Sequence, residues 1–237
     1  MISDNKKGNP YHDEEGKFAS ANSFAGKVKK NLGMQEISKP VFDGDFYRNA
    51  YKDGYKVEEG SDTATLGEGR IDYLIDEYGV WNENSNYAKA YLTYINPNDF
   101  IGATLTNEDT TTNSELEQIQ NLDLDRINNE SQTMFLDIDF DNGVVVGHEG
   151  RHRMKAFASA GIKFVPVVIR NKSESFDKTN TEELILDGNI MGQDFDGVRK
   201  GSKINVSGMR LIPLNFKHKR NLLNEFYKEN TIDNESI

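Results

Sequence analysis

The chain contains no cysteine, which excludes disulfide bonds, thiolate catalysis and cysteine-ligated zinc or iron–sulfur sites. It also lacks any apolar run approaching the roughly 18 residues that a membrane span requires. The first 17 residues have no apolar core of the kind found in signal peptides. We therefore expect a cytoplasmic protein that does not associate with membranes.

Positive charge is scarce. The formal net charge is -11 and the sequence pI is about 4.9. Such a surface repels nucleic acid phosphates and anionic lipid headgroups. We therefore expect no broad nucleic-acid-binding surface, and any anion site must be a local basic patch. The composition identifies no protein partner.

Apolar residues are also few, at 36% of 237 residues, which suits one core of moderate size with a polar remainder. Residues 1–44 hold few large apolar side chains and predict a disordered N-terminal tail. We expect residues 45–230 to form a single domain.

The spacing of apolar residues predicts the elements of that domain. Helical spacing predicts helices at 70–78, 84–91, 153–160 and 218–227, and Ser114 with Glu117 predicts a helix start. Alternating or β-branched runs predict strands at 91–95, 134–139, 144–146, 164–169, 204–206 and 209–214. Pro166 predicts an edge position or a bulge for its strand, and His218 is interpreted as a surface residue. The fold class is therefore α+β (or α/β), with a single small mixed sheet and flanking helices.

The segment from Gly147 to Arg153, with the sequence GHEGRHR, lies between a predicted strand and a predicted helix. Asn142-Gly143 predicts a hairpin turn before that strand. Gly161 predicts the C-terminal cap of the helix. The densest group of cations in this acidic chain therefore lies where a helix begins.

That position favours an anion, because the N-terminus of a helix presents unpaired N–H groups and a partial positive charge. Arg151, His152 and Arg153 would repel this charge, and a bound phosphate would relieve the repulsion. Gly147 and Gly150 would let the phosphate approach the main chain closely. The flanking residues Glu149 and His148 are the candidate catalytic residues, with Glu149 as a base or as a metal ligand near the phosphate. We assign no residue to a resident metal.

A structural alternative explains the same charges without a ligand. Arg153 would form an ion pair with Asp137 or Asp139 across the sheet, because structural networks also gather charge.

The sequence from Val144 to Ile169, VVVGHEGRHRMKAFASAGIKFVPVVI, resembles the second conserved block of the ParB/sulfiredoxin superfamily. In that block an apolar strand leads through a Gly-x-x-Arg turn into a helix ending in Ala-Gly and then a Val-Pro-Val strand. The resemblance implies a nucleotide, ATP or CTP with Mg²⁺, whose phosphates would contact Gly150, Arg151, His152 and Arg153. It implies NTP hydrolysis or phosphotransfer as the reaction. The sulfiredoxin cysteine and a basic helix-turn-helix region are both missing.

A rival interpretation takes His148 to His152 as the zinc peptidase motif H-E-x-x-H, in which two histidines on one helix share a metal. Gly150 opposes it by weakening the required helix by about 1 kcal/mol relative to Ala. Arg151 places a cation beside the would-be zinc. Only four residues separate the Asn142-Gly143 turn from His148, which fits a strand better.

The N-terminal segment Gly8 to Ala21 resembles a short tag found on phage-encoded proteins, including head-morphogenesis proteins. It implies a bacteriophage origin, and therefore the host cytoplasm or the virion as the location. It also raises a third hypothesis, a non-enzymatic virion or interaction protein that retains the fold.

We predict that a chain starting at Phe42 folds like the full chain, because the composition of the removed residues cannot offset the entropy cost of ordering them. Circular dichroism melting curves of both chains should coincide. A shortened chain recovered only as aggregate would contradict a disordered tail.

Overall fold

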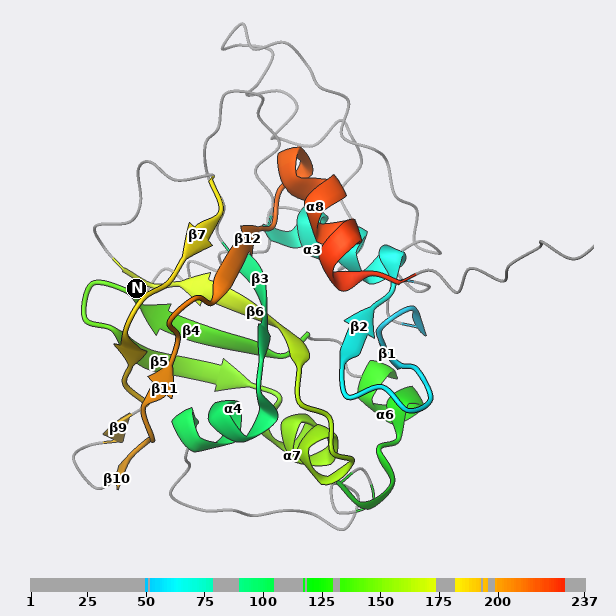
Figure 1. Ribbon diagram of the computed structural model, residues 1–237, viewed down its shortest axis with the longest axis horizontal. Helices are drawn as coiled ribbons and strands as arrows, with labels where there is room; N and C mark the ends of the chain where they lie inside the picture. The colour runs from blue at the N-terminus through cyan, green and yellow to red at the C-terminus, as the bar shows by residue number, and fades with distance from the viewer. Residues whose placement is uncertain are drawn as a thin grey trace, which may run out of the picture.

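The computed structural model describes residues 50, 52–78, 90–104, 117, 119–129, 133–173, 182–192, 194–195 and 199–228 (Figure 1). The predicted tail, the predicted helix start at Ser114 and most of the helix predicted at 84–91 lie outside these residues.

Six strands form one mixed sheet in the order β5-β4-β6-β3-β12-β7. Strands β4 and β6 are parallel, and every other neighbouring pair in this sheet is antiparallel. The strands are β3 (Ala90–Ile95), β4 (Phe135–Asp139), β5 (Val144–Glu149), β6 (Val165–Asn171), β7 (Leu184–Ile185) and β12 (Arg210–Pro213). The sheet and its flanking helices confirm an α+β fold.

The prediction that Pro166 marks an edge strand or a bulge is wrong, since β6 lies inside the sheet between β4 and β3. The β4–β6 ladder begins only where Phe135 faces Val168. Pro166 lies before that point, so its missing N–H removes no bond from this ladder. Its carbonyl instead accepts a hydrogen bond of 2.9 Å from the Tyr55 hydroxyl.

The helices pack in two groups at opposite ends of the sheet (Figure 1). At one end α4 (Pro97–Ala103) packs against α7 (Arg151–Ser159), and at the other α3 (Glu68–Tyr78) packs against α8 (Lys219–Phe226). The short helix α6 (Leu124–Asn129) packs against β1 (Tyr55–Val57), which pairs with β2 (Ala64–Leu66). None of the described helices is both long and apolar enough to cross a bilayer.

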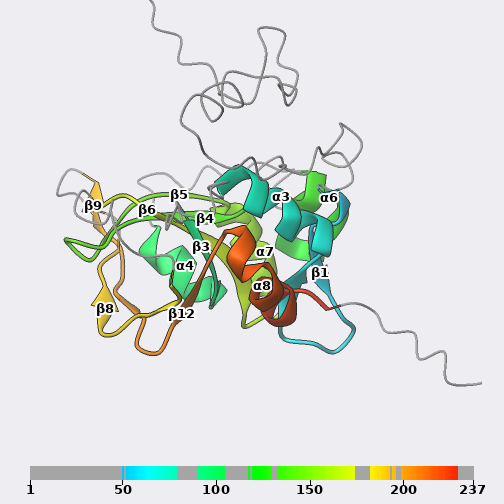
Figure 2. The ribbon, with the colours of Figure 1, turned by 90° about the horizontal axis from the view of Figure 1, so that it is seen from above.

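Short C-terminal strands lie to one side of the sheet beside α4 (Figure 2), and β11 packs against this helix. They are β8 (Asn189–Ile190), β9 (Asp194–Phe195), β10 (Arg199–Lys200) and β11 (Ile204–Asn205), which pair as β8 with β11 and β9 with β10. The residue after β8, Met191, bridges to Val144 at the start of β5. The C-terminal segment therefore contacts both edges of the six-stranded sheet, through β7 and through Met191.

Candidate anion site at a strand-to-helix turn

The candidate residues span the end of β5, one connecting glycine and the first turn of α7. Gly147, His148 and Glu149 belong to β5, which continues three residues beyond its predicted end. Gly150 is the N-cap of α7, which begins two residues before its predicted start. The predicted handover from strand to helix is therefore confirmed, with a connection of a single residue.

Both glycines of the turn pack closely on their neighbours, and only Gly150 combines this with a backbone conformation that requires glycine. Gly150 has a φ of 97°, in the left-handed region. A Cβ placed on Gly150 would lie 2.3 Å from Cγ of Met134, and one on Gly147 would lie 3.0 Å from Oδ2 of Asp137. These contacts give the glycines a structural role. The expectation that they admit an anion stays a prediction.

Arg153 points into the protein and is only 5% exposed. Its Nη2 lies 3.2 Å from Oε1 of Glu149, whose side chain is 49% exposed. Burial raises the pKa of Tyr55 to about 12, although the Arg153 and Arg70 guanidinium groups act against this rise. Arg153 is therefore a buried cation that pairs with the exposed Glu149 and acts electrostatically on the Tyr55 hydroxyl.

The predicted pairing of Arg153 with Asp137 or Asp139 is wrong, because another cation occupies Asp137. Arg170, on the neighbouring strand β6, donates two hydrogen bonds of 2.6 and 2.7 Å to its carboxylate. The same guanidinium lies 3.4 Å from the centre of the Phe135 ring, within cation–π range. Asp139 instead accepts hydrogen bonds within the hairpin turn, including one of 2.6 Å from Nδ2 of Asn142.

Helix α4 forms the neighbouring wall of the turn. Its N-cap, Asn96, accepts a hydrogen bond from the N–H of Asn98, and Pro97 occupies the first helical position. Near the other end of α4, Arg151 Nη1 donates to the carbonyl of Ile101. The rings of Phe100 and His148 meet edge to face with centroids 6.4 Å apart. The start of α7 and the end of β5 are thus both fixed against α4.

The first turn of α7 has an unusual charge arrangement. Helix N-termini favour acidic side chains, but this turn contains no acidic residue. It contains Arg151, His152 and Arg153 instead, and its cap, Gly150, has no side chain to accept a backbone hydrogen bond. The acid nearest in sequence, Glu149, belongs to the preceding strand and pairs with Arg153.

The zinc peptidase interpretation requires His148 and His152 on one turn of an uninterrupted helix. The structure places His148 in β5 and His152 in α7, with the left-handed Gly150 between them. The helical geometry of that motif is therefore not formed. Among the residues that the structure describes, no group of three or more metal-binding side chains comes together.

Sequence reasoning missed several residues that complete the site. Met134 lies against Gly150, the Tyr55 ring packs against Phe157 of α7, and Arg70 acts on the pKa of Tyr55; none of the three belongs to a local motif. The interpretation of His218 as a surface residue is wrong. It is 6% exposed, and its Nδ1 lies 3.0 Å from Oδ1 of Asn215.

Comparisons with protein-family models, with curated proteins and with solved structures find no match to this chain.

We predict that Gly150→Ala destabilises the protein by about 2–5 kcal/mol, from the left-handed backbone and the overlap with Met134. Gly161→Ala is the matched control, because Gly161 also has a positive φ but nothing within 4 Å of its added Cβ. Its cost should stay near 1–2 kcal/mol. Urea unfolding measures both, and equal losses would contradict the steric role of Met134.

We predict that Arg153→Gln lowers the free energy of unfolding by about 1.5–3 kcal/mol, because it removes a charge-assisted hydrogen bond from a buried side chain. The exposed Lys203, changed to Gln, serves as the control and should have little effect. Melting curves without ligand provide the measurement. An unchanged melting temperature for Arg153→Gln would contradict a structural role for this arginine.

Proposed function

We propose that the turn from Gly147 to Arg153 binds the phosphates of a nucleotide, in a domain of the ParB/sulfiredoxin type. The observation that carries the proposal is the first turn of α7, where three basic residues follow a glycine cap and no acidic residue is present. A phosphate supplies acceptors for backbone N–H groups and negative charge at the positive end of the helix dipole.

The order of the elements supports the resemblance. Strand β5, the Gly150 turn, helix α7 and strand β6 follow one another as the superfamily's second block requires. The β3 strand and α4 would correspond to the first strand and helix of the family, and α4 packs directly on α7. This correspondence concerns element order, and the family assignment remains our proposal.

Because Arg153 is buried and Arg151 and His152 are not, we assign the basic residues different roles. Arg151 and His152 are both partly exposed, and we assign them the direct contacts to phosphate. The guanidinium group of Arg153 is buried and forms an ion pair with the exposed carboxylate of Glu149. If a phosphate oxygen replaces the Glu149 carboxylate, the Arg153 guanidinium becomes a third group that binds the phosphate, and its side chain need not move.

A magnesium ion would suit the carboxylate of the turn. Mg²⁺ prefers oxygen ligands and is commonly held by one or two carboxylates together with phosphate oxygens. Glu149 fits this requirement, because its side chain is half exposed and lies one residue before the cap of α7. Bound there, the ion would neutralise phosphate charge, and His148 would then orient or deprotonate the attacking group, a role that falls to Glu149 only if it does not hold the ion.

The test is a thermal-shift panel of ATP, CTP and inorganic phosphate, each with and without Mg²⁺. A nucleotide at 100 times its Kd stabilises by about 2.7 kcal/mol, which in a domain of this size corresponds to roughly 5–10 °C. His152→Asn should reduce this shift strongly while leaving the melting temperature without ligand unchanged. Lys203→Gln is the control that changes an exposed cation outside the turn.

Two outcomes would count against the proposal. Equal shifts with phosphate alone and with nucleotides would leave an anion site with no nucleotide specificity. The absence of any shift would favour the third hypothesis, a non-enzymatic interaction or virion protein.

A further inference from the structure

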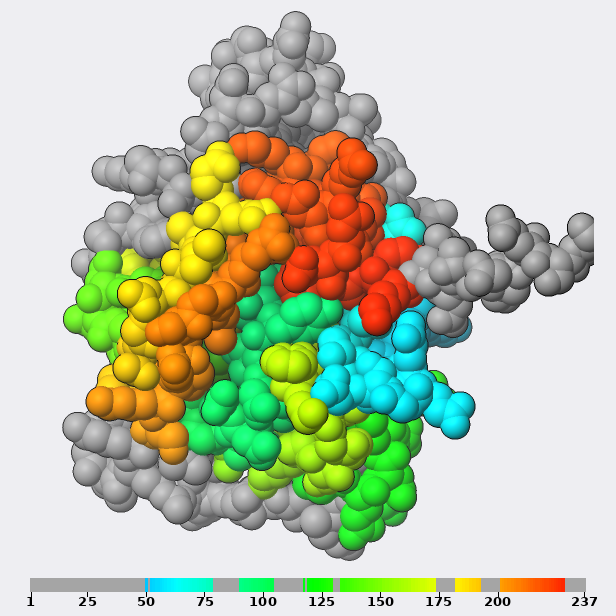
Figure 3. Space-filling view, viewed as in Figure 1, coloured from blue at the N-terminus to red at the C-terminus, as the bar shows by residue number. Residues whose placement is uncertain are grey.

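A groove of about 340 Å³ lies between β3, the start of α4, the β11–β12 segment and the end of α8. Figure 3 shows it between the orange β11–β12 segment, the red end of α8 and the green segment that contains α4. Its apolar floor includes the buried Ile212 and Phe226. This groove is distinct from the turn at Gly150, because none of the residues from Gly147 to Arg153 lines it.

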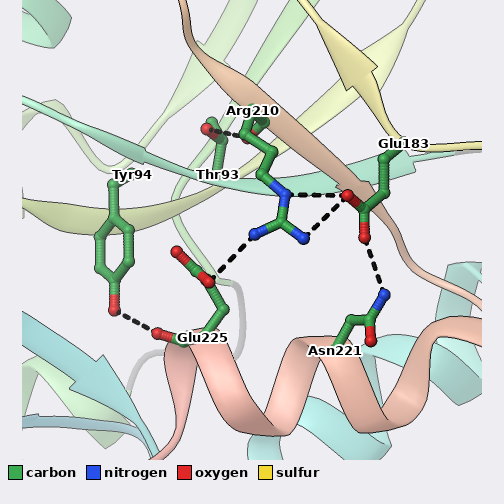
Figure 4. Close-up of polar contacts among 6 residues, drawn as sticks. All are labelled: Thr93, Tyr94, Glu183, Arg210, Asn221 and Glu225. Atoms are coloured by element: carbon green, nitrogen blue, oxygen red, sulfur yellow. Dashed lines mark hydrogen bonds and ion pairs between the residues drawn. The ribbon is translucent and has the colours of Figure 1, made fainter.

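Arg210 is the one basic residue among those that line the groove, and its guanidinium group is already paired with two carboxylates. Arg210 donates from Nε and Nη2 to Oε2 of Glu183, both at 2.8 Å, and from Nη1 to Glu225 at 3.2 Å (Figure 4). Glu183 also accepts a hydrogen bond of 2.8 Å from Asn221. Burial alone would raise the pKa of Glu183, but the hydrogen bonds from Arg210 and Asn221 outweigh it and lower the pKa. The Glu183 carboxylate therefore meets Arg210 as an anion.

The groove consequently carries excess negative charge. Among the lining residues, Asp99 and Glu225 contribute -2 and Arg210 contributes +1, which leaves a formal charge of -1, and Glu183 outside the lining further neutralises Arg210. Asp99 is exposed and makes no hydrogen bond or ion pair with the other residues that the structure describes. Glu225 is 44% exposed, so part of its carboxylate remains accessible beside Arg210.

Aromatic side chains complete the lining. Phe164 is 47% exposed, so its ring is accessible from the groove. The Tyr94 ring lies 4.7 Å from that of Phe226, and its hydroxyl donates to the carbonyl of Glu225 (Figure 4). Burial raises the pKa of Tyr94 to about 12, so its hydroxyl is neutral. Aromatic faces beside carboxylates attract cations through both the ring quadrupole and the charge.

We infer that this groove binds an organic cation, a guanidinium or ammonium group on a short aliphatic stem. The charged end is held by Asp99 and Glu225, while the stem packs on Phe164 and the apolar floor. The volume suits a ligand of amino acid size. The same chemistry is offered by a free amine or guanidine and by an arginine side chain of a peptide. The inference is independent of nucleotide binding at Gly150.

The experiment titrates n-butylguanidinium into the ¹⁵N-labelled full-length protein, with the uncharged isostere n-butylurea as the matched ligand. Amide shifts should concentrate at Tyr94, Asp99, Phe164 and Ser207, and the guanidinium should bind at least tenfold more tightly than the urea. Equal affinities of the two ligands, or shifts located elsewhere, would overturn the inference.

Asp99→Asn should weaken guanidinium binding about tenfold, the loss of one charge-assisted contact. The matched control is Asp125→Asn, because Asp125 is an exposed acid in the first turn of α6, as Asp99 is in α4. Equal weakening by both variants would indicate general attraction to an acidic surface and would contradict the site. A Gly-Arg-Gly peptide with blocked ends, compared with butylguanidinium, distinguishes the sources: tighter peptide binding indicates a protein partner, and weaker binding a free amine or guanidine.

Discussion

The close packing of Gly150 on Met134 constrains the single residue at which β5 ends and α7 begins. A side chain at Gly150 would overlap Met134, and the left-handed backbone reverses the chain within a single residue. Because the reversal is so short, the helix starts directly at the end of the sheet, beside α4. The glycine therefore fixes both the position and the direction of the helix dipole on which the proposed site depends.

The charges around this turn form two separate systems. Asp137 and Arg170 join the parallel strands β4 and β6 through a bidentate contact, which is the geometry that gives a guanidinium–carboxylate pair its specificity. Glu149 and Arg153 instead join the exposed end of β5 to the buried side of α7. The first pair serves the sheet, and the second leaves one carboxylate accessible to solvent.

Local periodicity was sufficient to predict the strands at 91–95 and 134–139, the Asn142-Gly143 hairpin and the helices at 70–78 and 218–227. Local periodicity gave wrong predictions where the structure depends on a contact between residues far apart in the sequence. Pro166 is tolerated inside the sheet because β4 starts two residues later in the register, which no local pattern reveals. The partner of Arg153 was predicted wrongly for the same reason, since Arg170 reaches Asp137 only through strand pairing.

The candidate site was located from sequence because its residues are contiguous, from Gly147 to Arg153. Its surroundings were not, because Tyr55, Arg70 and Met134 come from three other segments that meet only in the folded protein. The organic-cation groove lies beyond sequence reasoning altogether. Its lining is drawn from β3, α4, the β11–β12 segment and the end of α8, and none of these contributes a recognisable motif.

The position of β3 has a consequence for synthesis on the ribosome. Leu92 pairs with Ile212, so 120 further residues must be translated before this edge of β3 meets its partner. Until then β3 and β6 can pair, but the other side of β3 exposes unpaired backbone groups on an apolar strand. The nascent chain is therefore most exposed to misassociation between the emergence of β6 and that of β12, which ends that interval.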